Sequence, residues 1–257
     1  MPALAADAIR TRGYCRFDGR DGATTQTVER GLERLRQALD HLPEDTHAPR
    51  ANRFRRYSRG ILIPWRHGHL EWVPNRGEPG DPYTEFWQGP YNPEYLDVVR
   101  RFKPIDESLR ADPLLMHLVW RDFDLTFWPD WLASCPFLVG VHYVKLMVTE
   151  AAAVAVSSPD HLHQDGEPFT FVHLVARDNA AGAGNVIATP QCAGRRPEDV
   201  ADCVVAEFEL QEPMESYGVH DRAVSHHVTA LRRGPEDRPG VRAVLLIDFT
   251  PMVPSLQ

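Results

Sequence analysis

The sequence predicts a mainly β protein with flanking helices, folded as a single domain over residues 1–257. Two features of the chain predict this class. Up to residue 135, helical periodicities alternate with stretches rich in Pro, Gly and Arg, whereas from Pro136 onward short apolar or alternating runs are separated by turn residues, as is typical of antiparallel strands. We therefore expect a mixed helical N-terminal part at 1–135 and a β core at 136–257.

Three helices are expected in the N-terminal part. Residues 25–42 carry leucine or valine at helical spacing and end at a proline: Val28, Leu32, Leu35, Leu39 and Leu42, followed by Pro43. Asn92-Pro93 predicts the start of a second helix that runs to Phe102, and Asp112-Pro113 predicts a third through Val119, because Asn and Asp cap helices and Pro is tolerated in the first turn. Short strands are expected at 54–57 and 60–64.

The C-terminal part is expected to consist mostly of strands. Their expected positions are 137–149, 169–176, 185–189, 204–210, 217–220, 223–231 and 241–249. Each run is rich in β-branched or aromatic residues and is bounded by turn residues.

Composition excludes several classes of function. The chain is 43% hydrophobic and 25% charged, as in ordinary globular domains, and no segment approaches the roughly 18 apolar residues of a membrane span. A net charge of −8 would repel a nucleic-acid backbone, so we expect neither nucleic acid nor a membrane as partner. The first residues lack a basic segment followed by an apolar run, which argues against secretion and favours the cytoplasm.

The cysteines carry little functional signal. Cys15, Cys135, Cys192 and Cys203 are scattered without CxxC spacing. Such spacing argues against a zinc site or a disulfide framework, so we expect free thiols in a reducing compartment.

The strongest functional pattern is His163-Gln164-Asp165. On an extended chain, residues separated by one position point to the same face, so one metal ion can take both ligands. A third ligand is expected 61 or 62 positions later, at His226 or His227, of which only one can reach the metal because adjacent strand residues face opposite sides. Two imidazoles and one carboxylate are the set that holds non-haem Fe(II) and leaves one face open. The alternative is that Asp-Gly is merely a turn flanked by surface histidines.

Arg242 favours the metal interpretation. It lies near the start of the otherwise apolar run 241–249, where a guanidinium is costly to bury unless it meets a carboxylate. The carboxylate of a bound dicarboxylic acid would meet that need. The alternative is a structural ion pair with an internal Asp or Glu.

With these residues identified, the chain resembles the 2-oxoglutarate and Fe(II)-dependent dioxygenases, and more narrowly the small bacterial branch of free amino acid hydroxylases such as isoleucine hydroxylase. The resemblance covers roughly residues 88–250. It is carried by residues 88–105, Val141-His-Tyr-Val-Lys145, His163-Gln-Asp-Gly166, Phe171-Val-His-Leu-Val-Ala-Arg-Asp-Asn179 and His226-His-Val-Thr229. The chain departs from the family pattern at His227, where Gly is common, and at Lys145, where Arg is common.

The resemblance implies a double-stranded β-helix, or jelly-roll, as the core. It also implies that His163, Asp165 and His226 bind Fe(II), that Arg242 binds the distal carboxylate of 2-oxoglutarate, and that O2 is the oxidant. The expected reaction is hydroxylation of a free amino acid or a similar small molecule, with succinate and CO2 as coproducts. Halogenating relatives replace the carboxylate ligand, so Asp165 favours hydroxylation. A homodimer is kept open.

Other residues near these motifs are candidates for contacts with the cosubstrate. Tyr143 and Lys145 share one face of an expected strand and His142 lies on the other, and one of these faces is expected to line the pocket. His173 and Arg177 share one face of the next strand. We expect Tyr143, Lys145, His173 and Arg177 to bind the cosubstrate or a substrate carboxylate, with ordinary packing as the alternative.

Alternative functions remain at this point. The basic cluster Arg50, Arg53, Arg55, Arg56 and Arg59 is either a solvated surface or includes a clamp for a substrate carboxylate. The substrate is a free amino acid or, alternatively, a carrier-bound or peptide residue. A non-catalytic, metal-dependent binding module is a third interpretation.

Overall fold

A computed structural model describes residues 2–89, 95–96, 98–157 and 159–253. Its main feature is an antiparallel seven-stranded sheet in the order β1-β11-β7-β14-β6-β2-β3. The strands are β1 (Tyr14–Asp18), β2 (Arg53–Leu62), β3 (Leu70–Trp72), β4 (Thr84–Phe86), β5 (Arg100–Phe102), β6 (Phe137–Val148), β7 (Phe169–Asp178), β8 (Ala180–Gly182), β9 (Asn185–Ala188), β10 (Val204–Phe208), β11 (Glu215–His220), β12 (Ser225–Val228), β13 (Leu231–Arg233) and β14 (Gly240–Pro251).

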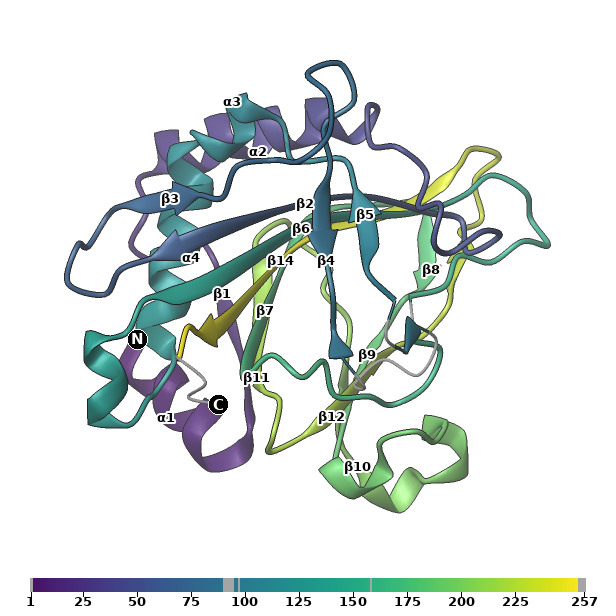
Figure 1. The fold of residues 1–257 in the computed structure, drawn as a ribbon. Helices are drawn as coiled ribbons and strands as arrows, with labels where there is room; N and C mark the ends of the chain where they lie inside the picture. Colours follow the sequence, from purple (N-terminus) through teal and green to yellow (C-terminus); the bar gives the residue numbers. More distant parts are fainter. Residues whose placement is uncertain (1, 90–94, 97, 158, 254–257) are drawn as a thin grey trace.

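Helices cover one face of this sheet, as Figure 1 shows. They are α1 (Pro2–Arg12), α2 (Thr25–Leu39), α3 (Glu107–Arg110) and α4 (Pro113–Leu125), with 3-10 turns at Asp130–Ser134, Pro190–Cys192, Pro197–Asp199 and Ala201–Cys203. The apolar side of α2 and most of α4 bury against alternate residues of β6, β7 and β14, and together these form the largest hydrophobic core. Burial of this apolar area is the main force that fixes the helices on the sheet.

A smaller sheet, β10-β9-β12, faces the other side of the large one. Its inward residues pack with β7, β11 and β14 in a second hydrophobic cluster that includes Leu174, Ile187 and Val244. Because side chains alternate along a strand, each long strand of the large sheet contributes one row to the helical side and one to the space between the sheets. The predicted class, mainly β with flanking helices, is confirmed.

Most of the expected elements are present. The helix expected at 25–42 is α2, capped by Thr24, whose hydroxyl accepts from the Thr27 amide, and the third helix is α4, capped by Asp112. The two short strands expected at 54–57 and 60–64 form the single strand β2. Helix α1 and strand β1 were not expected.

The second expected helix is wrong where the structure describes it. Residues 100–102 form β5, which pairs with β4, and residues 90–94 and 97 lie outside the described part. Arg100 and Phe102 are buried while Arg101 is exposed, which is the alternation of a strand. Val98 and Val99, which lie within the expected helix, are half exposed.

The expectation of four free thiols is also wrong for one pair. Cys192 and Cys203 form a disulfide, whereas Cys15 and Cys135 are free. Short 3-10 turns between β9 and β10 fold the intervening segment back, so residues 11 apart in sequence meet. Among the described residues, no helix is long and apolar enough to cross a membrane.

Candidate active site

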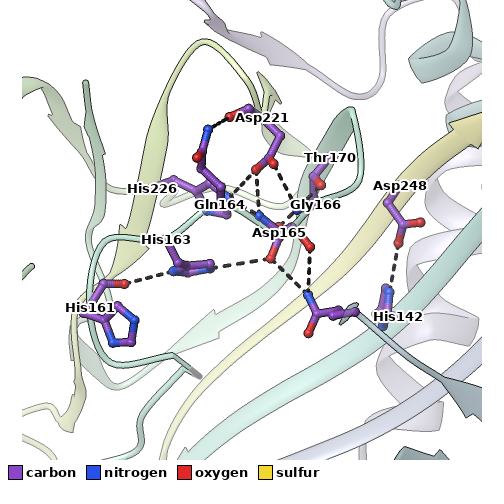
Figure 2. Close-up of polar contacts among 11 residues, drawn as sticks. His142, His161, His163, Gln164, Asp165, Gly166, Thr170, Asp221, His226 and Asp248 are labelled. Atoms are coloured by element: carbon purple, nitrogen blue, oxygen red, sulfur yellow. Dashed lines mark hydrogen bonds and ion pairs between the residues drawn. The ribbon is translucent and has the colours of Figure 1, made fainter. Parts of the chain in front are cut away.

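Three side chains with metal-ligand chemistry meet between the two sheets (Figure 2). His163 lies in the loop before β7 and His226 lies on β12, and a single antiparallel bridge joins them. The His163 amide donates to the His226 carbonyl at 3.0 Å, and the His226 amide donates back at 2.9 Å. This bridge therefore holds the backbones of the two histidines side by side, and the centres of their rings lie 4.4 Å apart.

The potential ligand atoms of His163, Asp165 and His226 all lie within 4.8 Å of one another. Asp165 places Oδ1 at 3.6 Å from His163 Nε2 and Oδ2 at 3.3 Å from His226 Nε2. His163 Nδ1 donates to the carbonyl of His161 at 2.9 Å, which leaves the lone pair of Nε2 directed at the cluster. His227 belongs to the opposite face of β12 and does not line the cavity.

The electrostatics of the cluster match a cation site. Burial lowers the pKa of His163 to about 3, so this imidazole is neutral. Burial opposes charge on Asp165 and His226 as well, but their mutual attraction outweighs it: the pKa of Asp165 falls well below its usual range, and Asp165 with Asp221 raises the pKa of His226 to about 10. A metal ion would take the place of the proton on His226.

The donor set fits divalent iron. His226 Nε2 is buried and makes no aligned hydrogen bond to any described residue, which is the state expected of a nitrogen whose partner is a metal. The cluster consists of one carboxylate and two imidazoles, which is the ligand set that non-haem Fe(II) oxygenases use on one face of the metal.

Asp221 holds the loop that carries Asp165. Its carboxylate is 3% exposed and accepts from the Asp165 amide at 2.7 Å and the Gly166 amide at 3.0 Å, while its carbonyl accepts from the side chain of Gln164 (Figure 2). Gly166 has φ +88°, a conformation that favours glycine, so the Asp-Gly pair is indeed a turn, but a turn that presents a ligand.

Arg242 lines the same cavity as the three ligands. It is 4% exposed, and its Nη2 donates to Asn185 Oδ1 at 3.3 Å, while its Nε has no partner among the described residues. No carboxylate of the described residues pairs with it, so the internal ion pair considered from the sequence is not formed. Burial lowers the pKa of Arg242 to about 10, which leaves it a cation at neutral pH. An anion that enters the cavity would supply the missing partner.

The structure places Tyr143 and Lys145 away from the cavity, which corrects the expectation that they bind the cosubstrate. They point to the helical side, where Tyr143 Oη donates to the Leu35 carbonyl at 2.6 Å and Lys145 Nζ donates to the Leu39 carbonyl at 2.7 Å. The Tyr143 hydroxyl and the Lys145 ammonium therefore bind backbone carbonyls near the C-terminal end of α2. The cavity is lined by the other face of β6, which carries His142.

His173 and Arg177 also lie outside the cavity, contrary to expectation. His173 is fully buried among the helices, where Nε2 donates to Asp122 Oδ2 at 2.7 Å and Nδ1 is hydrogen-bonded to Ser216 Oγ at 2.8 Å. Arg177 Nη2 donates to the Gly182 carbonyl at 2.8 Å and to Glu209 Oε2 at 3.0 Å. Both residues have partners within the chain, although Arg177 Nη1 has none among the described residues.

The polar part of the cavity wall, apart from the candidate ligands, Arg242 and Thr170, consists of Arg53, Arg55, Gln88, Arg100, His142, Ser157, Glu167, Tyr217 and Asp248. Sequence reasoning considered Arg53, Arg55 and His142 only as alternatives and missed the others. The available signal was strand alternation: His142 has the parity of Val144 and Leu146, and Asp248 has the parity of Arg242. Burial and Arg55 lower the pKa of His142 to about 4, so it is a neutral ring that accepts from Arg55 at Nδ1 and donates to Asp248 from Nε2 at 2.9 Å.

A facial His-Asp-His cluster and an unpaired buried arginine in one cavity between two antiparallel sheets define the site of a non-haem iron oxygenase that takes a dicarboxylic cosubstrate. The comparison with known families agrees. The model of the family described as 2OG-Fe dioxygenase matches residues 36–248, and the chain belongs to this family. The family indicated by the sequence is confirmed, and with it Fe(II), 2-oxoglutarate and O2 as cofactor and cosubstrates.

Named relatives lie within the same branch. The chain is 31% identical over 163 residues to L-isoleucine-4-hydroxylase of Bacillus thuringiensis, an alignment that spans 62% of each chain. It is 26% identical to 3(1)-hydroxy-L-isoleucine 4-dioxygenase of Pantoea ananatis over 85% of this chain and 80% of the relative. The crystal structure of IDO from Bacillus thuringiensis superposes with a TM-score of 0.73 at 22% identity, over 98% of this chain and 96% of that one, so the two share a fold.

Proposed function

We propose that this protein hydroxylates a free amino acid, using Fe(II), O2 and 2-oxoglutarate. The observation that carries the proposal is the joint placement of His163, Asp165, His226 and Arg242 on one cavity. Bound iron would supply the oxidative chemistry, in which 2-oxoglutarate loses CO2 to give succinate and one oxygen atom enters a C–H bond of the substrate.

The chain's own residues would bind and orient. His163, Asp165 and His226 would hold the iron through Nε2, a carboxylate oxygen and Nε2. Arg242 would bind the distal carboxylate of 2-oxoglutarate, with Asn185 fixing one of its nitrogens. The apolar wall between them, which includes Val172 and Val244, would exclude water from the reacting centre.

The relatives support an amino acid as substrate. Two of them are named as enzymes that act on L-isoleucine or its hydroxylated form. The small-molecule class agrees with a cavity whose lining is contributed by strands of both sheets. A cytoplasmic location, a homodimer and the lack of nucleic-acid and membrane partners stay predictions.

The experiment is mass spectrometry of reactions that contain Fe(II), 2-oxoglutarate and pooled L-amino acids. We expect succinate together with an amino acid that has gained one oxygen atom. Asp165→Ala and His226→Ala should abolish both products, whereas His227→Ala is the matched control, because His227 neighbours a ligand but faces away from the cavity. Unchanged succinate formation in both ligand variants would refute the proposal.

A second measurement separates an enzyme from a binding module. Fe(II) binding by wild type and the three variants can be followed by equilibrium dialysis with metal analysis. Loss of an outer hydrogen-bond partner lowers metal affinity about 10- to 100-fold. Removing a ligand should lower the affinity for Fe(II) by more than this. Iron binding without any turnover across the amino acid pool would favour the binding module instead.

A further inference from the structure

Two arginines form a second basic site in the cavity, apart from Arg242. Arg55 on β2 and Arg100 on β5 both line the cavity. Their guanidinium carbons lie 5.2 Å and 4.8 Å from the centre of the Phe86 ring, and that of Arg55 lies 4.4 Å from the Phe102 ring. The two cations therefore share one aromatic cage.

Neither cation has an acidic partner among the described residues. Arg55 donates to the neutral ring of His142 and Arg100 donates to the amide oxygen of Gln88, while the Nε of each has no partner. Arg53, two positions before Arg55 on the same strand, shows the contrasting case, because it pairs with Asp45 at 2.8 Å. Two neighbouring buried cations with open donors are costly unless an anion joins them.

An acidic side chain without a hydrogen-bond partner among the described residues, Glu167, lines the same cavity. Glu167 follows the metal-binding turn and lines the cavity, and its carboxylate makes no hydrogen bond to another described residue. Asp248, by contrast, has a partner on each oxygen, because Oδ2 accepts from His142 at 2.9 Å and Oδ1 accepts from the Gly140 amide at 3.2 Å. Burial and the carboxylates of Asp248 and Asp165 raise the pKa of Glu167, and a cation bound beside it would favour its ionised form. Glu167 is therefore the acidic side chain that is available to a ligand.

We propose that this end of the cavity recognises the head group of a free α-amino acid, with Arg55 and Arg100 binding the α-carboxylate and Glu167 binding the α-ammonium. The proposal rests on the proposed function and narrows it. The remaining wall is apolar and includes Val144, Val172 and Leu246, so an aliphatic side chain would lie on it. A residue linked through its carboxyl to a carrier or a peptide would leave both arginines unpaired and be rejected.

The test is ligand retention, which needs no turnover. Protein loaded with 2-oxoglutarate and Zn(II) is dialysed against an equal mixture of L-valine, L-leucine, L-isoleucine and L-methionine, against the matching 2-hydroxy acids, which lack the ammonium, and against the matching amides, which lack the carboxylate. Wild type should retain an amino acid at least about tenfold better than either analogue, because each analogue leaves one charged partner unsatisfied.

Two variants assign the charges. Glu167→Gln should retain amino acids and 2-hydroxy acids about equally and still prefer amino acids to amides. Arg100→Gln should retain amino acids and amides about equally and still prefer amino acids to 2-hydroxy acids. Arg101→Gln is the matched control, since Arg101 is the exposed neighbour of Arg100 on β5. General damage to the fold would lower the retention of all three ligand classes alike. It would therefore not produce this selective change in preference.

The outcomes separate this proposal from the previous one. The head-group site is overturned if wild type retains the analogues to the same extent as the amino acids, or if it retains none of the mixtures. This holds whichever result the variants give. If the same preparation still forms succinate and an oxygenated product, the proposed function stands without it. Failure of both succinate formation and 2-oxoglutarate binding would instead overturn the proposed function.

Discussion

The two faces of the seven-stranded sheet use polar residues in opposite ways. On the helical face, Tyr143, Lys145 and His173 each have a hydrogen-bond partner within the chain. On the cavity face, Arg242 and Arg55 keep donors without a partner among the described residues. All five residues lie on strands of the same sheet, and all except the partly buried Arg55 are buried.

The difference identifies the functional face. A buried polar group with all its partners in the chain stabilises a unique packing, whereas one with open donors or acceptors costs stability until a ligand arrives. Substitutions on the helical face should therefore lower stability and leave ligand binding intact, and substitutions on the cavity face should do the opposite.

The largest effect is expected at the buried pair of His173 and Asp122. His173→Leu leaves the Asp122 carboxylate fully buried without its imidazole partner, and burial already raises the pKa of Asp122. We expect the free energy of unfolding to fall by about 3–5 kcal/mol, the usual cost of breaking a buried pair. Urea denaturation measures this loss.

Binding of 2-oxoglutarate to the folded His173→Leu protein should stay within a factor of about two, because His173 lies outside the cavity. A large loss of 2-oxoglutarate affinity with unchanged stability would reverse the assignment of the two faces.

Arg242→Leu should show the opposite pattern. Loss of a charged partner from a buried ion pair costs about 2–5 kcal/mol, so the affinity for 2-oxoglutarate should fall about 30-fold or more. The unliganded protein should be as stable as wild type or more so, since an unpaired buried cation has been removed. Calorimetric titration and denaturation, run side by side, measure both quantities, and Lys145→Met on the helical face serves as control. Equal losses of stability in the two variants would contradict the comparison.

The sequence identified the candidate ligands His163 and Asp165 because their spacing is local, with one residue between them. The third candidate, His226, came from the family pattern. Arg242 was detectable because a cation in an apolar strand is conspicuous. The structure brings all four to one cavity.

Tyr143 was misassigned because alternation separates a strand into two faces without saying which one meets the helices. Both faces of β6 carry polar and apolar residues, so the choice depends on packing between distant elements. Arg100 was missed for a related reason: it lines the cavity from β5, which pairs with β4, and no local pattern encodes that contact. The disulfide of Cys192 likewise depends on the fold of its loop.

A smaller effect on the cavity face is expected at Asp221. Asp221→Asn replaces one acceptor oxygen by a donor, so the amides of Asp165 and Gly166 can no longer both be satisfied. We expect Fe(II) affinity to fall about 10- to 100-fold, as for other partners that orient a metal ligand. The control is Arg222→Gln, because Arg222 is the exposed neighbour of Asp221. Equal iron affinity in Asp221→Asn and wild type would show that the turn holds Asp165 unaided.

The smallest effect comes from two tyrosines that differ in the face they occupy. Tyr143→Phe removes the hydrogen bond to the Leu35 carbonyl, so the free energy of unfolding should fall by about 1 kcal/mol with no change in 2-oxoglutarate affinity. Tyr217 lines the cavity and makes no hydrogen bond to a described residue, so Tyr217→Phe should leave the free energy of unfolding unchanged and weaken 2-oxoglutarate binding a few-fold.

Thermal unfolding and calorimetric titration of both variants measure the two quantities. If each variant changed both quantities to the same extent, open hydrogen-bonding capacity would not distinguish the two faces, and the argument from Arg242 and Arg55 would lose its basis.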